Sequence, residues 1–328
     1  MATKPAQTPR KRLWEHLVKP MLIQPTPAGL YAEPRFWMEG KDLEGFNAHI
    51  SYGFIKHPGP IHPLKGALVH PFDELLIFAG IDNTNIRYLG AEASVELGEE
   101  REVQMFDKPT VVLVPKGTPH GPITVNKLER PIVHYTIGLA PAYSASVAAG
   151  AATPTTGEKY KSLIVPLVNK KSSVNVKDES GMGYEETMGS DGVMRPAENS
   201  QVVKLGPGNA DELVWLYGGD LGMKVNFTWG FYTKCGKWHR AGEAHTHPEE
   251  EVLVFVGLDP DDLNYMGAEI EYGMGAEDER YIFNTPTVFI CPKGFPHLPC
   301  ITRWVDKPYG FFVACLDASH DAPWAENS

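Results

Sequence analysis

The sequence predicts an all-β protein built from two related β-barrel domains in tandem. Two observations predict this fold. The chain repeats itself at an offset of 177 residues, which places His70 on His247, and each copy is a series of short apolar runs separated by turn-forming residues. The chain has 328 residues with 32 glycines and 28 prolines, a length that fits two domains and a composition that favours turns over long helices.

The internal repeat is too strong to be accidental. Residues 49–139 align with residues 226–316 without a gap, and 29 identities fall within positions 49–122. Unrelated sequences of ordinary composition match at roughly one position in sixteen. The chain is therefore predicted to be an internal duplication.

The repeat and the composition divide the chain into four parts. Residues 1–34 are predicted to form an N-terminal arm, and residues 35–141 the first domain. Residues 142–210 begin with a stretch rich in alanine, serine, threonine and glycine and are predicted to form a linker that wraps the surface. Residues 211–328 form the second domain.

Charge and composition exclude several classes of protein. The net charge is −11, which argues against nucleic acid or anionic lipid as a partner. No run of about 18 apolar residues exists, so no membrane-spanning segment is expected, and the basic N-terminus lacks the apolar region of a signal peptide. The four cysteines form no CxxC pair. We therefore expect free thiols and a cytoplasmic protein.

The second copy contains a set of residues with the spacing of metal ligands. His245, His247 and Glu251 form a His-x-His-x3-Glu run, and His297 follows a Pro-Lys-Gly-Phe-Pro turn. Residues two apart on a strand point to the same face, so the first two histidines are expected to point inward together. Three imidazoles and one carboxylate suit Fe(II), Mn(II), Ni(II) or Zn(II). Histidines that merely fill a barrel are the alternative.

These two motifs, in this order, resemble those of the cupin superfamily. The resemblance covers both copies and implies two tandem jelly-roll barrels, a bicupin, with a metal held by the second copy. The first copy departs from the pattern because Leu68 replaces the first histidine, while His70, Glu74 and His120 remain. It is predicted to be a degenerate, largely metal-free domain. The alternative is a weak His-Glu-His site that His62 completes.

Other residues near the motifs are candidates for a role in chemistry. His239 has a counterpart in the first copy, His62, so it is either an acid or base that reaches bound substrate from beside the ligands or a structural residue. Five aromatic residues are candidates to line a substrate pocket, although each alone is more often part of a core. They are Trp229, Phe231, Trp238, Phe295 and Trp304.

A cupin site does not specify its reaction. The layout resembles bicupin aromatic dioxygenases and the large subunit of two-component hydroquinone 1,2-dioxygenases. That resemblance implies an Fe(II)-dependent, ring-cleaving dioxygenase that uses O2 and a hydroquinone-like or other hydroxylated aromatic substrate. The cupin resemblance implies a homodimer, and the dioxygenase resemblance gives a hetero-oligomer with a small subunit as the alternative. The alternatives are a decarboxylase, isomerase or lyase that depends on Mn(II) or another metal, and a non-catalytic bicupin that binds a small molecule.

Overall fold

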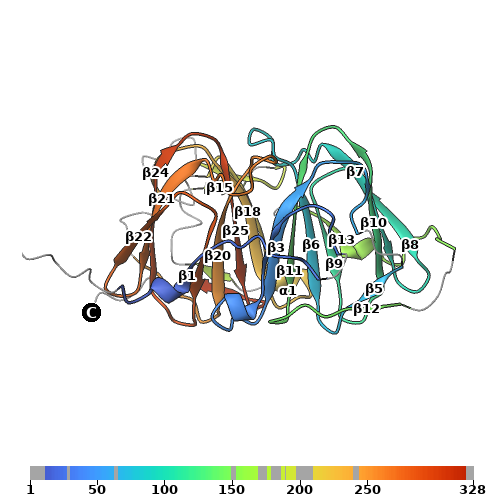
Figure 1. The fold of residues 1–328 in the computed structure, drawn as a ribbon, viewed down its shortest axis with the longest axis horizontal. Coiled ribbons are helices and arrows are strands. Elements are labelled where there is room, and N and C mark those ends of the chain that lie inside the picture. The colour runs from blue at the N-terminus through green and yellow to red at the C-terminus, as the bar shows by residue number, and fades with distance from the viewer. Residues whose placement is uncertain are drawn as a thin grey trace, which may run out of the picture.

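Two β-barrels lie side by side in the computed structural model, the first copy in blue to green and the second in yellow to red (Figure 1). The structure describes residues 12–27, 30–62, 66–148, 153–168, 176–178, 186–188, 190–196, 210–238 and 244–322. The predicted all-β fold of two tandem jelly-roll barrels is confirmed. Within the described residues, no helix is long and apolar enough to cross a membrane.

The first barrel consists of two sheets. One has the order β13 (Ile164–Pro166), β9 (Thr110–Val114), β6 (Glu74–Ala79), β11 (Ile132–Gly138), β3 (His49–Ile55) and β2 (Phe36–Met38). The other has the order β12 (Ser146–Val147), β5 (Leu68–Val69), β10 (His120–Leu128), β7 (Ala91–Leu97) and β8 (Glu102–Phe106), with β4 (Gly59–Pro60) also paired to β10. Two 3-10 helices, Gly40–Asp42 and Lys161–Leu163, lie in its loops.

The second barrel repeats this arrangement. Its larger sheet has the order β1 (Val18–Pro20), β23 (Thr287–Cys291), β20 (Glu251–Gly257), β25 (Tyr309–Cys315), β18 (Asn226–Tyr232), β17 (Glu212–Leu216), β16 (Met194–Pro196) and β15 (Glu186–Met188). Its smaller sheet has the order β19 (Gly236–Lys237), β24 (His297–Val305), β21 (Ala268–Met274) and β22 (Glu279–Phe283). Three short elements complete it: the 3-10 helix Glu15–Leu17, helix α1 (Gly218–Leu221), and the parallel pair of β14 (Val176–Asp178) with β26 (His320–Ala322).

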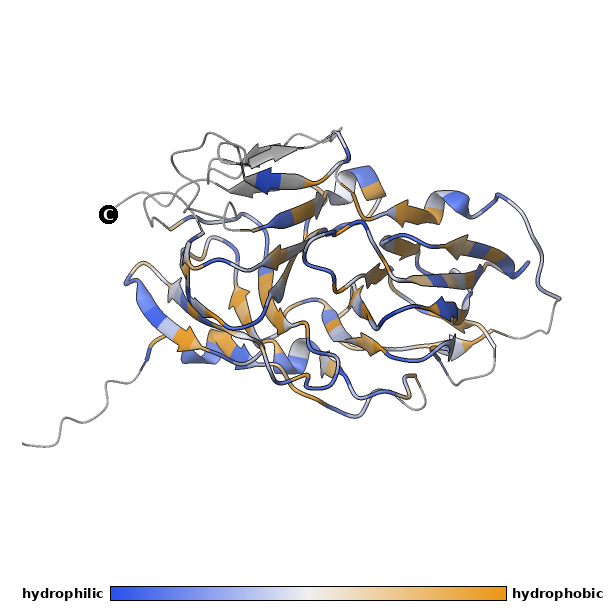
Figure 2. Ribbon diagram, turned by 90° about the horizontal axis from the view of Figure 1, so that it is seen from above, coloured by the Kyte–Doolittle hydropathy of each residue, from blue (hydrophilic) through white to orange (hydrophobic). Residues whose placement is uncertain are grey.

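The strands form where the sequence can bury one or both faces. Along β7, buried residues alternate with partly exposed ones, as expected for a strand with one face in the core. Strands β6 and β20 are buried along their whole length because each lies in the middle of its sheet. Hydrophobic residues accordingly concentrate in the strands of both barrels, whereas connecting segments are more hydrophilic (Figure 2). The two copies thus bury their apolar residues in the same way.

The two barrels differ in the strand at one edge of equivalent sheets, next to β9 in the first barrel and next to β23 in the second. In the first barrel this strand is β13, from the segment predicted to be a linker. In the second barrel it is β1, from the N-terminal arm, which pairs with β23 so that Val18 faces Phe289. Leu17 and Met21, on either side of this strand, are buried. Strand β1 of the N-terminal arm is therefore part of the second barrel, whereas Leu30, later in the arm, packs with Trp37 and Leu68 of the first barrel.

Aromatic residues from equivalent positions meet where the barrels contact each other. Tyr52 and Tyr135 of the first copy align with Trp229 and Phe312 of the second. The ring of Tyr135 stacks on Phe312 with centroids 4.5 Å apart and lies 5.5 Å from Trp229. The Tyr52 hydroxyl donates a hydrogen bond to the Gly257 carbonyl across the interface at 2.7 Å. The interface therefore has approximate two-fold character, as duplication predicts.

Candidate metal centre

The candidate ligands come from three places that the barrel brings together. His245 forms an isolated bridge with His297, in which the backbone amide of each donates to the carbonyl of the other at 3.1 Å. His297 begins β24 and Glu251 begins β20, and His247 lies in the loop that joins His245 to β20. The strand expected at the two neighbouring histidines is thus reduced to a single bridge. In the first barrel the aligned residues Leu68 and His120 pair in the same register.

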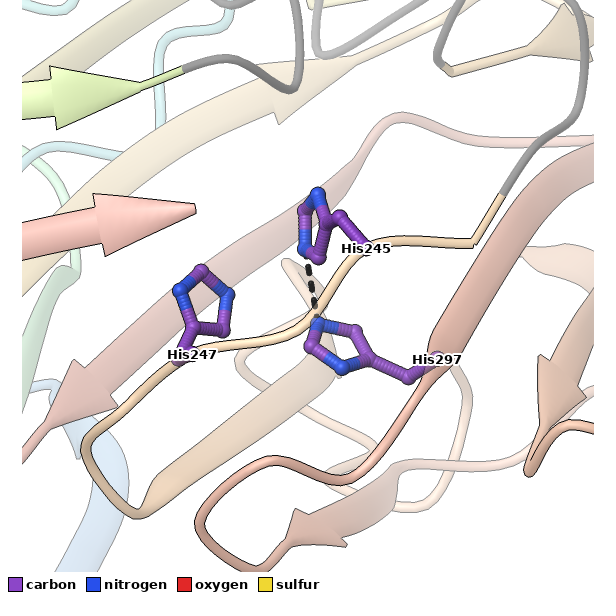
Figure 3. Close-up of side chains that lie close together, drawn as sticks. All are labelled: His245, His247 and His297. Atoms are coloured by element: carbon purple, nitrogen blue, oxygen red, sulfur yellow. Dashed lines mark hydrogen bonds between the residues drawn. The ribbon is translucent and has the colours of Figure 1, made fainter. Parts of the chain in front are cut away.

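The four side chains converge inside the second barrel. The Nε2 atoms of His245 and His297 are 2.8 Å apart (Figure 3). Oε2 of Glu251 lies 3.1 Å from Nε2 of His247 and 3.2 Å from Nε2 of His297. None of the four residues is more than 6% exposed. All four residues predicted to be ligands therefore lie together in a buried cluster.

The electrostatics of this cluster fit a bound cation. Ligand atoms of His245, His247 and His297 all lie within 4.8 Å of one another. Burial by itself raises the pKa of the Glu251 carboxyl, but His247 and His297 outweigh burial and hold that pKa well below its usual value. Oε2 of Glu251 has no hydrogen-bond partner among the described residues, despite the two nearby nitrogens. A divalent cation would satisfy these converging lone pairs, and nitrogen and oxygen donors suit Mn(II), Fe(II) or Zn(II).

Two cysteines flank the glutamate, and sequence reasoning did not place them there. Cys291 on β23 and Cys315 on β25 are both register partners of Glu251. The Cys315 thiol donates to Oε1 of Glu251 at 3.6 Å, and burial raises the pKa of both thiols well above its usual value. The thiol therefore holds one carboxylate oxygen and leaves the other turned toward the histidines.

A pocket of about 40 Å³ opens beside the cluster. Its described lining is mainly apolar and aromatic, with no lysine or arginine. The lining residues are Leu213, Trp215, Thr228, Tyr232, Trp238, His245, His247, Glu251, Leu253, Tyr272, Leu298, Phe311, Val313 and His320. The arrangement can hold a small ligand among mainly apolar side chains, against a metal ion.

Of the five aromatic residues predicted to line a pocket, the structure brings Trp238 to it. Trp229 is buried at the barrel interface, and Phe231 packs against it edge to face. Phe295 contacts Trp14 of the N-terminal arm. Trp304 lies on the surface and is 52% exposed. His239, the candidate second-shell residue, lies outside the described residues.

A second pair of polar residues lies behind the cluster. Nδ1 of His320 is 3.0 Å from Oε1 of Glu249, and both side chains are buried. The same oxygen lies 3.9 Å from Nδ1 of His247. The sequence carries no signal for this pair, because His320 follows the second motif at a distance that only the folded barrel closes.

The first barrel retains three of the four candidate ligands. Oε2 of Glu74 lies 3.2 Å from Nε2 of His70 and 3.6 Å from Nε2 of His120. Leu68 is buried where the fourth ligand would be. His62 is buried too, and burial lowers its pKa to about 3, but it lies outside the group whose ligand atoms are within 4.8 Å of one another. A metal-free first barrel stays a prediction.

The sequence matches no protein-family profile and no curated protein. Three similar solved structures are those of oxalate decarboxylase from Bacillus subtilis: one at pH 4.6, one with a two-residue deletion and one with a serine replaced by alanine. Each is 11% identical to this chain and has a TM-score of 0.53 or 0.54. The matched region covers 94% of this chain and 78–79% of the oxalate decarboxylase chain. At this identity the likeness concerns the fold alone, a pair of β-barrels in tandem. The resemblance to hydroquinone 1,2-dioxygenase finds no support in these structures.

Proposed function

We propose that this chain is a mononuclear metal-dependent enzyme with its active centre in the second barrel. His245, His247, Glu251 and His297 would hold the ion. The convergence of their buried nitrogen and oxygen atoms, with a carboxylate kept ionised, carries this proposal. Mn(II) and Fe(II) are the ions proposed first, since mixed imidazole and carboxylate sites bind both. Zn(II) and Ni(II) remain alternatives.

Decarboxylation of a small carboxylic acid is the proposed reaction. The similar structures carry the name oxalate decarboxylase, and the pocket is small. A cavity that binds benzene in another protein has about 150 Å³, so a pocket of about 40 Å³ favours a substrate of few atoms. In such a reaction the bond between the carboxyl carbon and its neighbour breaks, CO2 leaves, and a proton takes its place on the remaining carbon. No oxidant is consumed.

Each part of the pocket has a task in this reaction. An ion held by His245, His247, Glu251 and His297 would supply positive charge to bind and polarise a substrate oxygen. The protein fixes the ligand positions: the backbone bridge positions His245 and His297, and the Cys315 thiol holds Glu251. The apolar walls exclude water, which strengthens every charge interaction inside the pocket.

Ring cleavage of a hydroxylated aromatic compound by O2 is the second candidate. The aromatic lining, which includes Trp238, Tyr232 and Tyr272, favours it. The two reactions differ in their need for oxygen, so they can be separated directly.

The test measures metal content and then turnover of the full chain loaded with Mn(II) or Fe(II). Release of CO2 from oxalate or another small acid without O2 would support the first candidate. Oxygen uptake with a hydroquinone would support the second. About one metal ion per chain in wild type, lost in His245→Ala, is expected in either case. Wild-type protein that binds no metal would refute both. The expected homodimer and small second subunit stay predictions, which native mass spectrometry would test.

A further inference from the structure

A buried carboxylate and imidazole form a pair at the wall of the second-barrel pocket. Glu249 is 4% exposed and His320 2% exposed, and their hydrogen bond is 3.0 Å long. His320 lines the pocket, and its ring centroid lies 4.9 Å from that of His247 and 4.8 Å from that of Trp215. His320 is therefore a hydrogen-bonding side chain held beside a proposed metal ligand.

The first barrel shows what the same two positions hold in the other copy. The offset of 177 residues places Phe72 at the position of Glu249 and Tyr143 at that of His320. The Tyr143 ring lies 5.1 Å from His70 and 5.5 Å from Trp37. His70 is the counterpart of His247, and Trp37 is that of Trp215 because the repeat shifts by one residue upstream, to an offset of 178. Phe72 stacks on His70 with centroids 4.9 Å apart. An aromatic pair thus replaces the acid and imidazole pair.

The Glu249–His320 pair is not needed for the barrel to fold. The first barrel forms without the polar pair, so the barrel fold does not require it. Burying a carboxylate and an imidazole costs free energy that an aromatic pair does not. The first barrel also lacks the ligand that His245 supplies, having Leu68 instead. The polar pair therefore accompanies the complete ligand set, which points to a role in the pocket.

We propose that His320, held in place by Glu249, binds the polar end of the substrate in the second-barrel pocket. This inference rests on the proposed function and deepens it by assigning a substrate contact. The substrate class is a small carboxylic acid, with one oxygen at the metal centre and another accepting a hydrogen bond from Nε2 of His320, while Nδ1 of His320 donates to Glu249. The described lining has no lysine or arginine, so this second oxygen needs another hydrogen-bonding partner. Glu249 acts through His320 and is a positioning residue.

The chain itself supplies a matched variant for the test. Glu249→Phe combined with His320→Tyr recreates the pair that the first barrel already accommodates, so the barrel is expected to fold. His320→Tyr alone removes the imidazole. Glu249→Gln keeps an oxygen that can accept from Nδ1 of His320 while removing the charge. All three are compared with wild type as full chains loaded with Co(II).

The probes are oxalate, formate and acetate, and the readout is the visible spectrum of the bound Co(II). We expect wild type to bind at least one probe. His320→Tyr and the double variant should bind it at least about tenfold more weakly, the order expected for a lost hydrogen bond to a charged group. Glu249→Gln should lie between, and Co(II) content should be equal in all four proteins.

The outcomes separate this inference from the proposed function. Equal probe affinity in wild type and His320→Tyr would overturn the inference and leave the metal centre standing. So would a wild-type spectrum that responds to none of the probes. Loss of Co(II) from the variants alone would also overturn it, because the pair would then support the ligands and not the substrate. A wild type that binds no Co(II) would reject the metal centre, and the inference with it.

Discussion

Tyr52 and Trp229 occupy the same position in the two copies and face each other across the barrel interface, with ring centroids 6.4 Å apart. Duplication made this contact possible, because a surface that becomes buried against its own copy needs only to be complementary to itself. The two residues also differ in one respect. The tyrosine adds a hydrogen bond to the Gly257 carbonyl that the tryptophan does not mirror.

Tyr52→Phe tests the strength of this interface. The change removes the hydroxyl and leaves the buried Gly257 carbonyl without that partner, so the free energy of unfolding should fall by about 1–3 kcal/mol. Urea unfolding followed by tryptophan fluorescence measures it. Tyr88→Phe is the control, because the Tyr88 hydroxyl bonds to Glu129 at the surface. An equal effect of both changes would contradict the importance of the interface bond.

Metal binding should depend on the second barrel and not on the first. His245→Ala removes a proposed ligand, and its loss of affinity should exceed the roughly 10–100-fold that removal of an outer-shell partner causes. His120→Ala removes the aligned partner of His297 in the first barrel and should leave the stoichiometry unchanged. Competition with a chromophoric chelator measures both. A stoichiometry that falls in His120→Ala would show that the first barrel holds metal as well.

The N-terminal arm should contribute measurably to stability. Leu17 is 4% exposed and packs in the core, whereas Leu13 is 53% exposed. Leu17→Ala should lower the free energy of unfolding by about 2–5 kcal/mol, through lost burial and the cavity that remains. Leu13→Ala should stay within about 0.5 kcal/mol of wild type. If both changes were neutral, the arm would not be part of the second barrel in solution.

His62 should make the protein less stable in mild acid. Burial, helped by the nearby His120, lowers its pKa from 6.5 to about 3. Between about pH 3 and pH 6.5 the His62 imidazole therefore takes up a proton more readily in the unfolded chain than in the folded protein. The contribution of neutral His62 to the free energy of unfolding is complete above about pH 6.5 and is lost as pH falls. At pH 5 the loss is about 2 kcal/mol.

The check on His62 compares unfolding at pH 7 and pH 5. His62→Phe cannot be protonated there, so stability should fall less between the two pH values in this variant than in wild type. His57→Phe, at an exposed position, should keep the wild-type pH dependence. Identical pH dependence in all three proteins would mean that His62 is not buried as the structure places it.

Much of the fold and of the candidate site followed from local patterns. The short strands and the His-x-His-x3-Glu spacing are properties of neighbouring residues, and the repeat is two matching stretches at a fixed offset, so the sequence displays all three directly. The four residues predicted to be ligands do lie together, because both motifs flank strands whose pairing the jelly roll fixes. The alignment of the two copies also identified Leu68 as the residue that replaces the ligand His245 in the first copy.

Other features depend on which strands become neighbours, and no local pattern encodes that. The arm strand β1 joins the second barrel by pairing with β23, which lies far from it in the sequence. Trp229 lies on β18 and Trp238 follows β19 nine residues later, yet one faces the other barrel and the other lines the pocket.

The amino-acid sequence by itself determined the two barrels and the four candidate ligands, because hydrophobic periodicity and ligand spacing are short-range. Only the tertiary structure decided which side chains surround those ligands. Cys315 reaches Glu251, and His320 reaches Glu249, through closure of the second barrel. The physical reason is that barrel closure brings together residues whose separation in the chain carries no information about their distance in space.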